Sequence, residues 1–491
     1  MAPAQLMDRL STLEQENAQL RAQLDWFKRN LFGTGKSEKS DALQLRLGLS
    51  GEEPVEPQQQ PETIQHKRAK GKPRTMPAER FKDLPVHETI ELIPEPVQAQ
   101  PELYQRIGEE VTFEVDITPP KLFKRQIVRP KFRHKLDPSL APLLRPAVPR
   151  AIEGGYASAG LLAYIALSKY LYHLPLYRQE KMSRHWGAYI SRKTMADWIE
   201  VVSDWFNPVY GRMRQNLLEG GYLQVDETPV RFMDPDFKKG KTTQGYLWVI
   251  GKPGSDVVFD WRLTRKHGEA TDLLSGFEGV LQSDGYAAYD KLVQNNDRVV
   301  RVACWAHARR KFTEAQRESP VGVGMVLRLI GNLYRLEQQW DQAGHTGTSH
   351  RSALRMSQFG QSLCLLKKVV VALQRKALPK SNLGKACTYL LGQWSALINH
   401  CLLGETRIDN NLIENAIRPS AIGKKNFLFI GSPGAGQRSA IIYSIIVSCE
   451  RHGIDPYAYM CDVLERLPKM TNQENIDALL PGNWKPVTRT R

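Results

Sequence analysis

The chain has 491 residues, 41% of them apolar, which is enough for about three domains with real cores. Lys and Arg number 68 against 52 Asp and Glu; the net charge of +16 favours a polyanionic partner, nucleic acid before a membrane surface. The six cysteines lie far apart without a CxxC pair, so neither a disulfide framework nor a zinc ribbon is indicated. No apolar run approaches the roughly 18 residues of a membrane span. We therefore expect no membrane partner and a location in the cytoplasm.

Residues 4–32 show the seven-residue repeat of a coiled coil. Two sets of residues line the seam: Leu6, Leu13, Leu20 and Phe27, and Leu10, Asn17, Leu24 and Leu31. A single polar Asn17 in an apolar seam favours a two-stranded, in-register pair. We therefore interpret residues 1–37 as a coiled-coil dimerisation helix and expect a homodimer or higher assembly. A helix that packs on its own domain is the alternative.

Residues 38–80 are rich in Gln, Pro, Lys and Glu, which predicts a flexible basic linker. Short apolar and polar runs alternate over 81–140, as at 110–115 and 122–128, and predict a small β-rich, DNA-binding module. The module carries a basic strip suited to contacting phosphates. The strip comprises Lys121, Lys124, Arg125, Arg129, Lys131, Arg133 and Lys135.

Residues 150–210 are predicted to be helical, with the layout of a helix-turn-helix. A helix that starts after Pro175 is followed by a glycine-containing break and by a helix that Ser191 caps. Arg192 and Lys193 open this second helix, where such motifs meet DNA. An ordinary pair of packed helices would show the same pattern.

One buried strand of the next region carries an acid. The run 222–230, YLQVDETPV, is typical of a buried strand and places Asp226 near its middle. An unpaired carboxylate in such a strand costs several kcal/mol, so we expect Asp226 to lie beside a cation. Because side chains alternate along a strand, Glu227 must point to the opposite face.

The strands that follow predict an RNase H-like α/β catalytic core over 220–318. Strands over 245–250 and 257–263 come at hairpin spacing, a helix follows, and the next strand ends at a second acid, Asp284. A further helix and a fifth strand over 299–304 complete the order of that fold. The remaining ranges are a helical insertion (319–402), the end of the catalytic core (403–450) and a C-terminal helix and tail (451–491).

A third acid, Glu414, falls in a predicted helix after an Asp/Asn cap. Three acids of this kind can bind two divalent cations about 3.5–4 Å apart, an arrangement that cleaves phosphodiesters. Carboxylate oxygens suit Mg²⁺ or Mn²⁺. Each acid alone is more often a cap or a surface charge.

These stretches resemble the transposases of the insertion sequence 66 family over nearly the whole chain. The matching runs are LFGTGKSEK at 31–39, RIGEEV at 106–111, VRPKF at 128–132, KYLYHLPLYRQE at 169–180, SRKTMADW at 191–198, VDETPV at 225–230, SDGYAAYD at 283–290, CWAHARRKF at 304–312 and DNNLIENAIRPSAIGKKNFLFIGS at 409–432. The resemblance implies a bacterial enzyme with an RNase H-like DDE fold. Its catalytic and metal-binding acids would be Asp226, Asp284 and Glu414, with two Mg²⁺ or Mn²⁺ ions per site.

The resemblance also implies partners. The enzyme would bind the terminal inverted repeats of its element through residues 81–200, cleave the 3′ ends and transfer them to target DNA, with accessory proteins of the same element as possible partners. Family members commonly carry a four-cysteine zinc module, but the matching segments 93–103 and 132–140 hold no cysteine, so we expect no zinc. The basic residues expected to meet DNA near the acids are His307, Arg310, Lys311, Arg418, Lys424 and Lys425.

Two other functions fit the same sequence. The first is a catalytically inactive, transposase-derived DNA-binding protein that occupies its old sites. The second is an RNase H-type nuclease that performs no strand transfer. The three acids argue against the first, and the predicted coiled coil and helix-turn-helix argue against the second.

Overall fold

The computed structural model describes residues 143–234, 241–294 and 296–486, together with 93–103, 121–132 and the single positions 86, 89, 91, 105, 111 and 135. The chain forms two compact units, Met1–Ile117 and Thr118–Arg491. The predicted coiled coil over 1–37 and linker over 38–80 lie outside the described residues. The boundary between the units falls inside the range 81–140 that the sequence predicts as one module.

The described part of the first unit contains a short helix, α4 (Glu95–Ala99), and a 3₁₀ turn, η1 (Pro101–Leu103). In the second unit, β1 (Lys131–Phe132) pairs antiparallel with β2 (Leu143–Leu144). The alternating run at 122–128, one of the two examples behind the predicted β-rich module, forms no strand, since residues 121–130 have no regular secondary structure. Leu122 packs partly against the core, but the other apolar side chains of this segment stay exposed, Phe123 at 78% and Val128 at 70%. A strand without a packed face is only marginally stable.

Three helices form the region where a helix-turn-helix is predicted: α5 (Ala159–Tyr170), α6 (Leu176–His185) and α7 (Arg192–Leu218). Ser191 caps α7 as the sequence predicts, because its side chain accepts the Thr194 N–H at 3.1 Å. The helix continues through Pro208 and ends at Leu218, eight residues beyond the predicted end of the region at 210. Its buried face, which includes Phe206 and Met213, packs in the main core against the strand at 257–262 and the later helix at 433–451.

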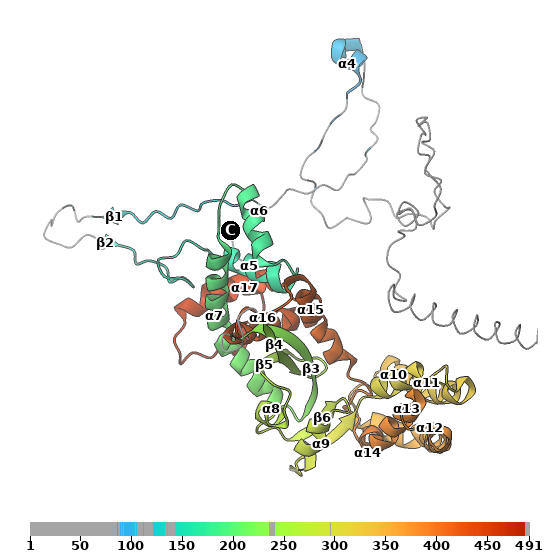
Figure 1. The fold of residues 1–491 in the computed structure, drawn as a ribbon. Helices are drawn as coiled ribbons and strands as arrows, with labels where there is room; N and C mark the ends of the chain where they lie inside the picture. Colours follow the sequence, from blue (N-terminus) through green and yellow to red (C-terminus); the bar gives the residue numbers. More distant parts are fainter. Residues whose placement is uncertain are drawn as a thin grey trace, which may run out of the picture. The chain divides into compact units, whose positions relative to one another are not determined.

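A five-stranded mixed sheet forms the centre of the second unit (Figure 1). Its strands are β3 (Tyr222–Met233), β4 (Thr242–Gly251), β5 (Val257–Arg262), β6 (Gly279–Ser283) and β7 (Val299–Ala303), in the spatial order β5-β4-β3-β6-β7. The first three are antiparallel neighbours, and β6 and β7 run parallel to β3. Helices α8 (His267–Leu273) and α9 (Ala287–Gln294) lie before and after β6, in the chain order that the sequence predicts.

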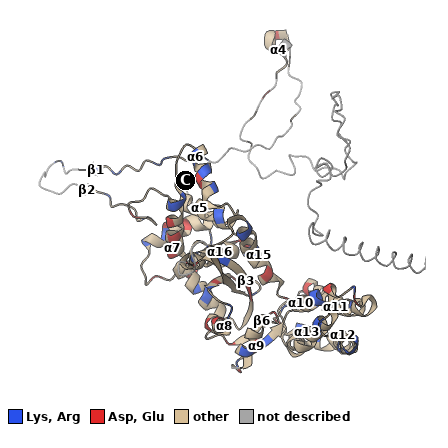
Figure 2. Cartoon of the chain, viewed as in Figure 1, with Lys and Arg blue, Asp and Glu red and all other residues tan. Residues whose placement is uncertain are grey.

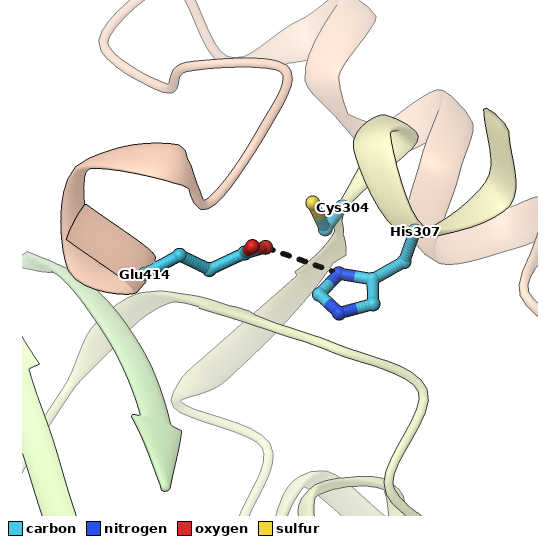
Figure 3. A group of neighbouring side chains, drawn as sticks. All are labelled: Cys304, His307 and Glu414. Atoms are coloured by element: carbon cyan, nitrogen blue, oxygen red, sulfur yellow. Dashed lines mark ion pairs between the residues drawn. The ribbon is translucent and has the colours of Figure 1, made fainter. Parts of the chain in front are cut away.

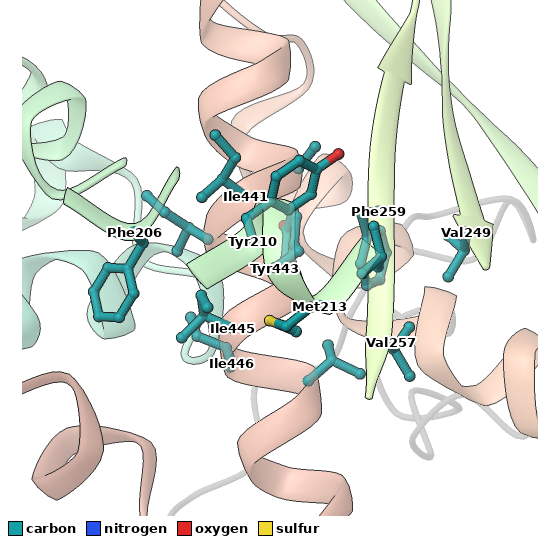
Figure 4. Close-up of a cluster of buried hydrophobic side chains, with 14 of the residues drawn as sticks. Phe206, Tyr210, Met213, Val249, Val257, Phe259, Ile441, Tyr443, Ile445 and Ile446 are labelled. Atoms are coloured by element: carbon teal, nitrogen blue, oxygen red, sulfur yellow. The ribbon is translucent and has the colours of Figure 1, made fainter. Parts of the chain in front are cut away.

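The helix α16 (Pro433–Arg451) packs on β5 and α7 and completes the core (Figure 4). Phe259 of β5 and Tyr443 of α16 contact each other there, with ring centroids 5.6 Å apart. The three glycines of the run 431–436 predict a glycine-rich loop there, but this is in part wrong, since Ser432 caps the helix and Pro433 begins it. A Cβ at Gly436 would lie 2.3 Å from the Trp261 ring, so this glycine serves close packing.

The helical insertion has a hydrophobic core of its own. It follows α10 (Trp305–Glu314) and comprises α11 (Pro320–Gln342), α12 (Ser349–Lys376), α13 (Asn382–Gly392), α14 (Trp394–Ile398) and η2 (Asn399–Leu402). The chain then returns to the sheet as α15 (Asn411–Phe427) and closes with α16, α17 (Pro456–Arg466), η3 (Leu467–Lys469) and η4 (Asp477–Leu479). None of the helices within the described ranges combines the length and apolarity that crossing a membrane requires.

Candidate active site

The register of the central strands sets two acids at the same level. β3 and β6 run parallel, and their last paired residues are Gln224 and Gln282. Asp226 lies two residues beyond Gln224, and Asp284 lies two residues beyond Gln282. Side chains two residues apart on a strand share a face. The sheet therefore carries both acids beyond the same end of the parallel pair.

Polar contacts fix the loop that carries Asp284. The Tyr286 N–H donates to Asp284 Oδ1 at 2.9 Å. From β7, Arg301 donates to the Asp284 main-chain carbonyl at 2.5 Å and to Asp290 Oδ1 at 2.7 Å. The Arg301 side chain is only 6% exposed, so the surrounding residues restrict its movement. The acid at the end of β6 is thus held from both its backbone and its side chain.

The third acid, Glu414, comes to the sheet because the segment before it is anchored there. Gln282 Nε2 donates to the Arg407 carbonyl at 2.8 Å, and Gln224 Nε2 donates to the Asp409 carbonyl at 3.1 Å. The buried Asn410 then donates from Nδ2 to the Val225 carbonyl at 3.0 Å. These bonds place the first turn of α15 beside the strand that carries Asp226.

Glu414 points toward the first turn of α10 (Figure 3). Its Oε2 forms an ion pair with Arg310 Nη2 at 3.1 Å, and its Oε1 lies 3.6 Å from His307 Nδ1. Within the described ranges, the one group of three potential ligand atoms that lie within 4.8 Å of one another comprises Cys304, His307 and Glu414. The three predicted acids do not form such a closed group.

Asp284 and Glu414 nevertheless lie close enough to Asp226 to affect its pKa. Burial, and after it the negative charges of Glu227, Asp284 and Glu414, together raise the pKa of Asp226 to about 8. One contact works in the other direction, because the Glu227 N–H donates to Asp226 Oδ1 at 2.8 Å. A carboxyl group with this pKa is mostly protonated at pH 7. Repulsion of this kind is what a bound divalent cation relieves, and an all-oxygen donor set fits a hard cation such as Mg²⁺.

The sequence predicts the direction of the Glu227 side chain but not its partners, Arg265 and Tyr289. Glu227 points to the other face of β3, where its side chain is 1% exposed and forms an ion pair with Arg265. Its Oε2 accepts the Tyr289 hydroxyl at 2.6 Å. The Arg265 guanidinium lies 3.9 Å from the centroid of the Tyr286 ring, in the loop that carries Asp284. A buried acid next to Asp226 was the only signal of this network in the sequence.

The structure brings some predicted DNA-contacting residues to the acids and leaves others apart. His307 and Arg310 contact Glu414, and Lys311 lies exposed on the same helix. On α15, Arg418 and Lys425 are exposed, whereas Lys424 donates to Thr228 Oγ1 at 3.1 Å and to the Pro229 carbonyl at 3.0 Å.

The remaining predicted contacts lie on other elements. Arg192 and Lys193 are exposed at the start of α7, and Figure 2 shows further Lys and Arg on the neighbouring α6. The exposed members of the basic strip are Lys121, Lys124, Arg125, Arg129, Lys131 and Lys135, and Arg133 lies outside the described residues.

Comparison with known families assigns the chain. A family profile described as "Transposase IS66 family" matches residues 154–438, and a second, described as "IS66 C-terminal element", matches 444–481. A third, described as "Transposase C of IS166 homeodomain", matches 19–88. The protein belongs to the IS66 transposase family.

Two relatives from Sinorhizobium fredii (strain NBRC 101917 / NGR234) are similar over most of their length. The chain is 31% identical to the uncharacterized protein y4jD over 394 residues, which cover 77% of this chain and 76% of the relative. It is also 31% identical to the uncharacterized protein y4qI over 398 residues, which cover 77% of this chain and 72% of the relative.

Proposed function

We propose that the protein is an active DDE transposase with an RNase H-like catalytic core. It would bind the ends of its element and catalyse metal-dependent 3′-end cleavage followed by strand transfer. One observation supports this proposal: Asp226 and Asp284 each lie two residues beyond the last β3–β6 pair, and the segment before α15, the helix of Glu414, is bonded to the strand of Asp226. The spatial order β5-β4-β3-β6-β7, with three antiparallel and two parallel strands, supports the RNase H-like assignment.

Asp226, Asp284 and Glu414 would hold two Mg²⁺ or Mn²⁺ ions. When bound, such ions lower the pKa of the attacking oxygen and neutralise the leaving oxygen. Asp226 must give up its proton before it accepts a cation, because its pKa is about 8. The ion pair with Arg310 holds Glu414 toward α10, and Arg265, the ion-pair partner of Glu227, lies against the Tyr286 ring in the Asp284 loop.

The proposed reaction has two steps, cleavage and strand transfer. In the first, a water oxygen bonds to the phosphorus at the element's 3′ end, the P–O3′ bond breaks, and the proton lost by the water is matched by one gained at the new 3′-OH. In the second, this 3′-OH attacks a phosphodiester of the target, forms a new P–O3′ bond and releases a target 3′-OH. Both steps displace an oxygen at phosphorus, so one carboxylate set serves both.

DNA contacts would come from separate surfaces. The first turn of α7 offers Arg192 and Lys193 for element ends, and Lys131 lies in the basic strip. Arg418, Lys425 and Lys311 are exposed on the two helices whose first turns meet at Glu414. Basic side chains here would hold phosphates near the acids. Assembly through residues 4–32 and help from accessory proteins belong to the same proposal.

The test compares the wild type with Asp226→Asn. Both are incubated with labelled DNA that carries the element's end and Mg²⁺, and binding and 3′ nicking are followed together. We expect both to bind and only the wild type to nick. If both bind and neither nicks, even with Mn²⁺ and partner proteins, a catalytically inactive DNA-binding protein becomes the better assignment.

A further inference from the structure

Two buried polar atoms face each other beside the acids without forming a hydrogen bond. His307 Nδ1 and Glu414 Oε1 lie 3.6 Å apart, which exceeds hydrogen-bonding distance. Neither atom has a hydrogen-bond partner among the residues that the structure describes, and both are shielded from solvent. Buried polar atoms are seldom left unpaired, so such a pair indicates an additional group between them.

The neighbouring side chains leave both atoms of this pair without a hydrogen-bond partner among the described residues. Arg310 occupies the other carboxylate oxygen, Oε2, at 3.1 Å, so Oε1 stays free. Cys304 Sγ is the third potential ligand within 4.8 Å, but it already accepts the Asn410 N–H at 3.2 Å. The imidazole and the carboxylate therefore remain as the available donors.

We propose that His307 Nδ1 is a ligand of the divalent cation held by Glu414 Oε1. This inference rests on the proposed function, since it adds a nitrogen donor to the three acids. Ligand atoms at about 2.1 Å from one cation can lie up to about 4.2 Å apart, so the observed separation requires no rearrangement. The sequence suggested a phosphate contact for His307, but α10 turns its Nδ1 toward Glu414 instead (Figure 3).

An imidazole donor changes which metal the site prefers. Sites with oxygen donors alone suit Mg²⁺, whereas imidazole suits transition metals and shifts preference toward Mn²⁺. The wild type should therefore bind Mn²⁺ distinctly more tightly than Mg²⁺. The competing explanation is a simple ion pair between a protonated His307 and Glu414, which would give the histidine no role in metal affinity.

The experiment measures Mn²⁺ binding to the full chain by electron paramagnetic resonance, with Mg²⁺ competition. Four variants are compared with the wild type: His307→Ala, His307→Asn, Glu414→Gln and, as a matched control, His185→Ala at the exposed end of α6. His307→Ala should weaken Mn²⁺ binding by about 10-fold or more. Asn can place an amide oxygen near the Nδ1 position, so His307→Asn should retain Mg²⁺ binding and lose the preference for Mn²⁺.

Each outcome separates this inference from the proposed function. If Glu414→Gln loses Mn²⁺ while His307→Ala binds it like the wild type, His307 is no ligand, and the three-acid site stands. If His307→Ala binds Mn²⁺ more tightly, the histidine is a protonated partner of Glu414 and the inference is overturned. If the wild type binds neither metal nor nicks end DNA, the proposed function fails, and the inference with it.

Discussion

The side-chain amide of Asn410 donates to the main-chain carbonyl of Val225 across 3.0 Å. Val225 immediately precedes Asp226, and Asn410 immediately precedes the helix that carries Glu414. The two residues are 185 positions apart in the chain. This single bond therefore couples the position of the third acid to that of the first, although neither acid takes part in it.

Replacing Asn410 should reduce both stability and cleavage. In Asn410→Ala, the Val225 carbonyl loses the buried amide that it accepts, which costs about 1–3 kcal/mol of unfolding free energy. Nicking of end DNA should fall further than binding, because the start of α15 loses its anchor. Chemical denaturation and a nicking assay measure the two effects. Asn411→Ala is the control, since its exposed side-chain amide donates to Asp409 and not to the sheet. An equal loss of stability and nicking in both variants would contradict the proposed coupling between Asn410 and Val225.

Asp226 should make the metal-free protein less stable as pH rises. Its pKa is about 8 in the folded chain against an ordinary value of 3.8, so between these pH values the folded chain keeps a proton that the unfolded chain has released. The contribution of this group to stability thus falls from about pH 4 to pH 8. Asp226→Asn removes that dependence and should raise the melting temperature at pH 8 by about 2 °C or more.

The melting curves are recorded with a chelator present, at pH 5 and pH 8. The gain from Asp226→Asn should shrink toward pH 5, because the carboxyl group is then protonated in the folded wild type. Asp197→Asn, at an exposed position of α7, serves as the control and should show no such trend. A gain that is the same at both pH values would show that the titration of Asp226 is not its source.

Glu227 should influence the pH at which Asp226 loses its proton and can bind a cation. Its charge raises the pKa of Asp226, second only to burial. Glu227→Gln keeps one acceptor oxygen for Arg265, and its amide N–H can donate to the Tyr289 hydroxyl oxygen in place of the lost acceptor. Because the substitution removes the charge, the acidic limb of the cleavage profile should move to lower pH by roughly one unit. The profile of kcat/KM against pH measures this shift. Glu314→Gln, exposed at the end of α10, should leave the profile in place.

The parts of this structure that could be predicted from the sequence are local ones. Ser191 capped a helix because a serine before the run RKTMADW satisfies the free N–H groups of its first turn. The strand with Asp226 was predictable because YLQVDETPV is a short apolar run, the length and composition of a buried strand. The alternation at 122–128 misled, since alternation predicts a strand only where one face is buried, and Phe123 is exposed.

The contacts that assemble the site could not be predicted in the same way. Arg310 and Glu414 are 104 residues apart, with the helical insertion between them, and no local pattern links them. Gly436 looked like a loop residue because its need for space arises only when Trp261 packs on it. Asn410 looked like an ordinary helix cap, yet its side chain bonds to Val225 instead of the helix. Each of these depends on tertiary packing.

The first turn of α7 should contribute salt-dependent DNA binding. Arg192 and Lys193 are both exposed there, and each phosphate contact adds about 0.9 to the slope of log affinity against log salt. The double variant Arg192→Ala/Lys193→Ala should therefore lower the slope for end DNA by about 2. Fluorescence anisotropy over a series of salt concentrations measures it. Arg375→Ala/Lys376→Ala, at the end of α12, removes the same charge and should leave the slope unchanged if binding is specific to α7.

Arg355 joins the helical insertion to the segment that anchors Glu414. Its guanidinium is 0% exposed and bonds to Glu337 at 2.7 Å. It also donates to the carbonyls of Leu403 at 2.6 Å and Thr406 at 2.8 Å, just before Asn410. The buried Arg355 side chain thus links the insertion to the candidate site, because the segment whose carbonyls it binds continues within a few residues into α15, the helix of Glu414.

Arg355→Met should cost about 3–5 kcal/mol of unfolding free energy, since it leaves Glu337 short of a buried partner. Hydrogen exchange in 400–410 should speed up, and nicking should fall even under conditions where the variant remains folded. The exposed Arg335→Met in α11 is the control and should change stability little. If Arg355→Met destabilises α11 and α12 while exchange in 400–410 and nicking stay at wild-type levels, the insertion is an independent unit that does not position Glu414.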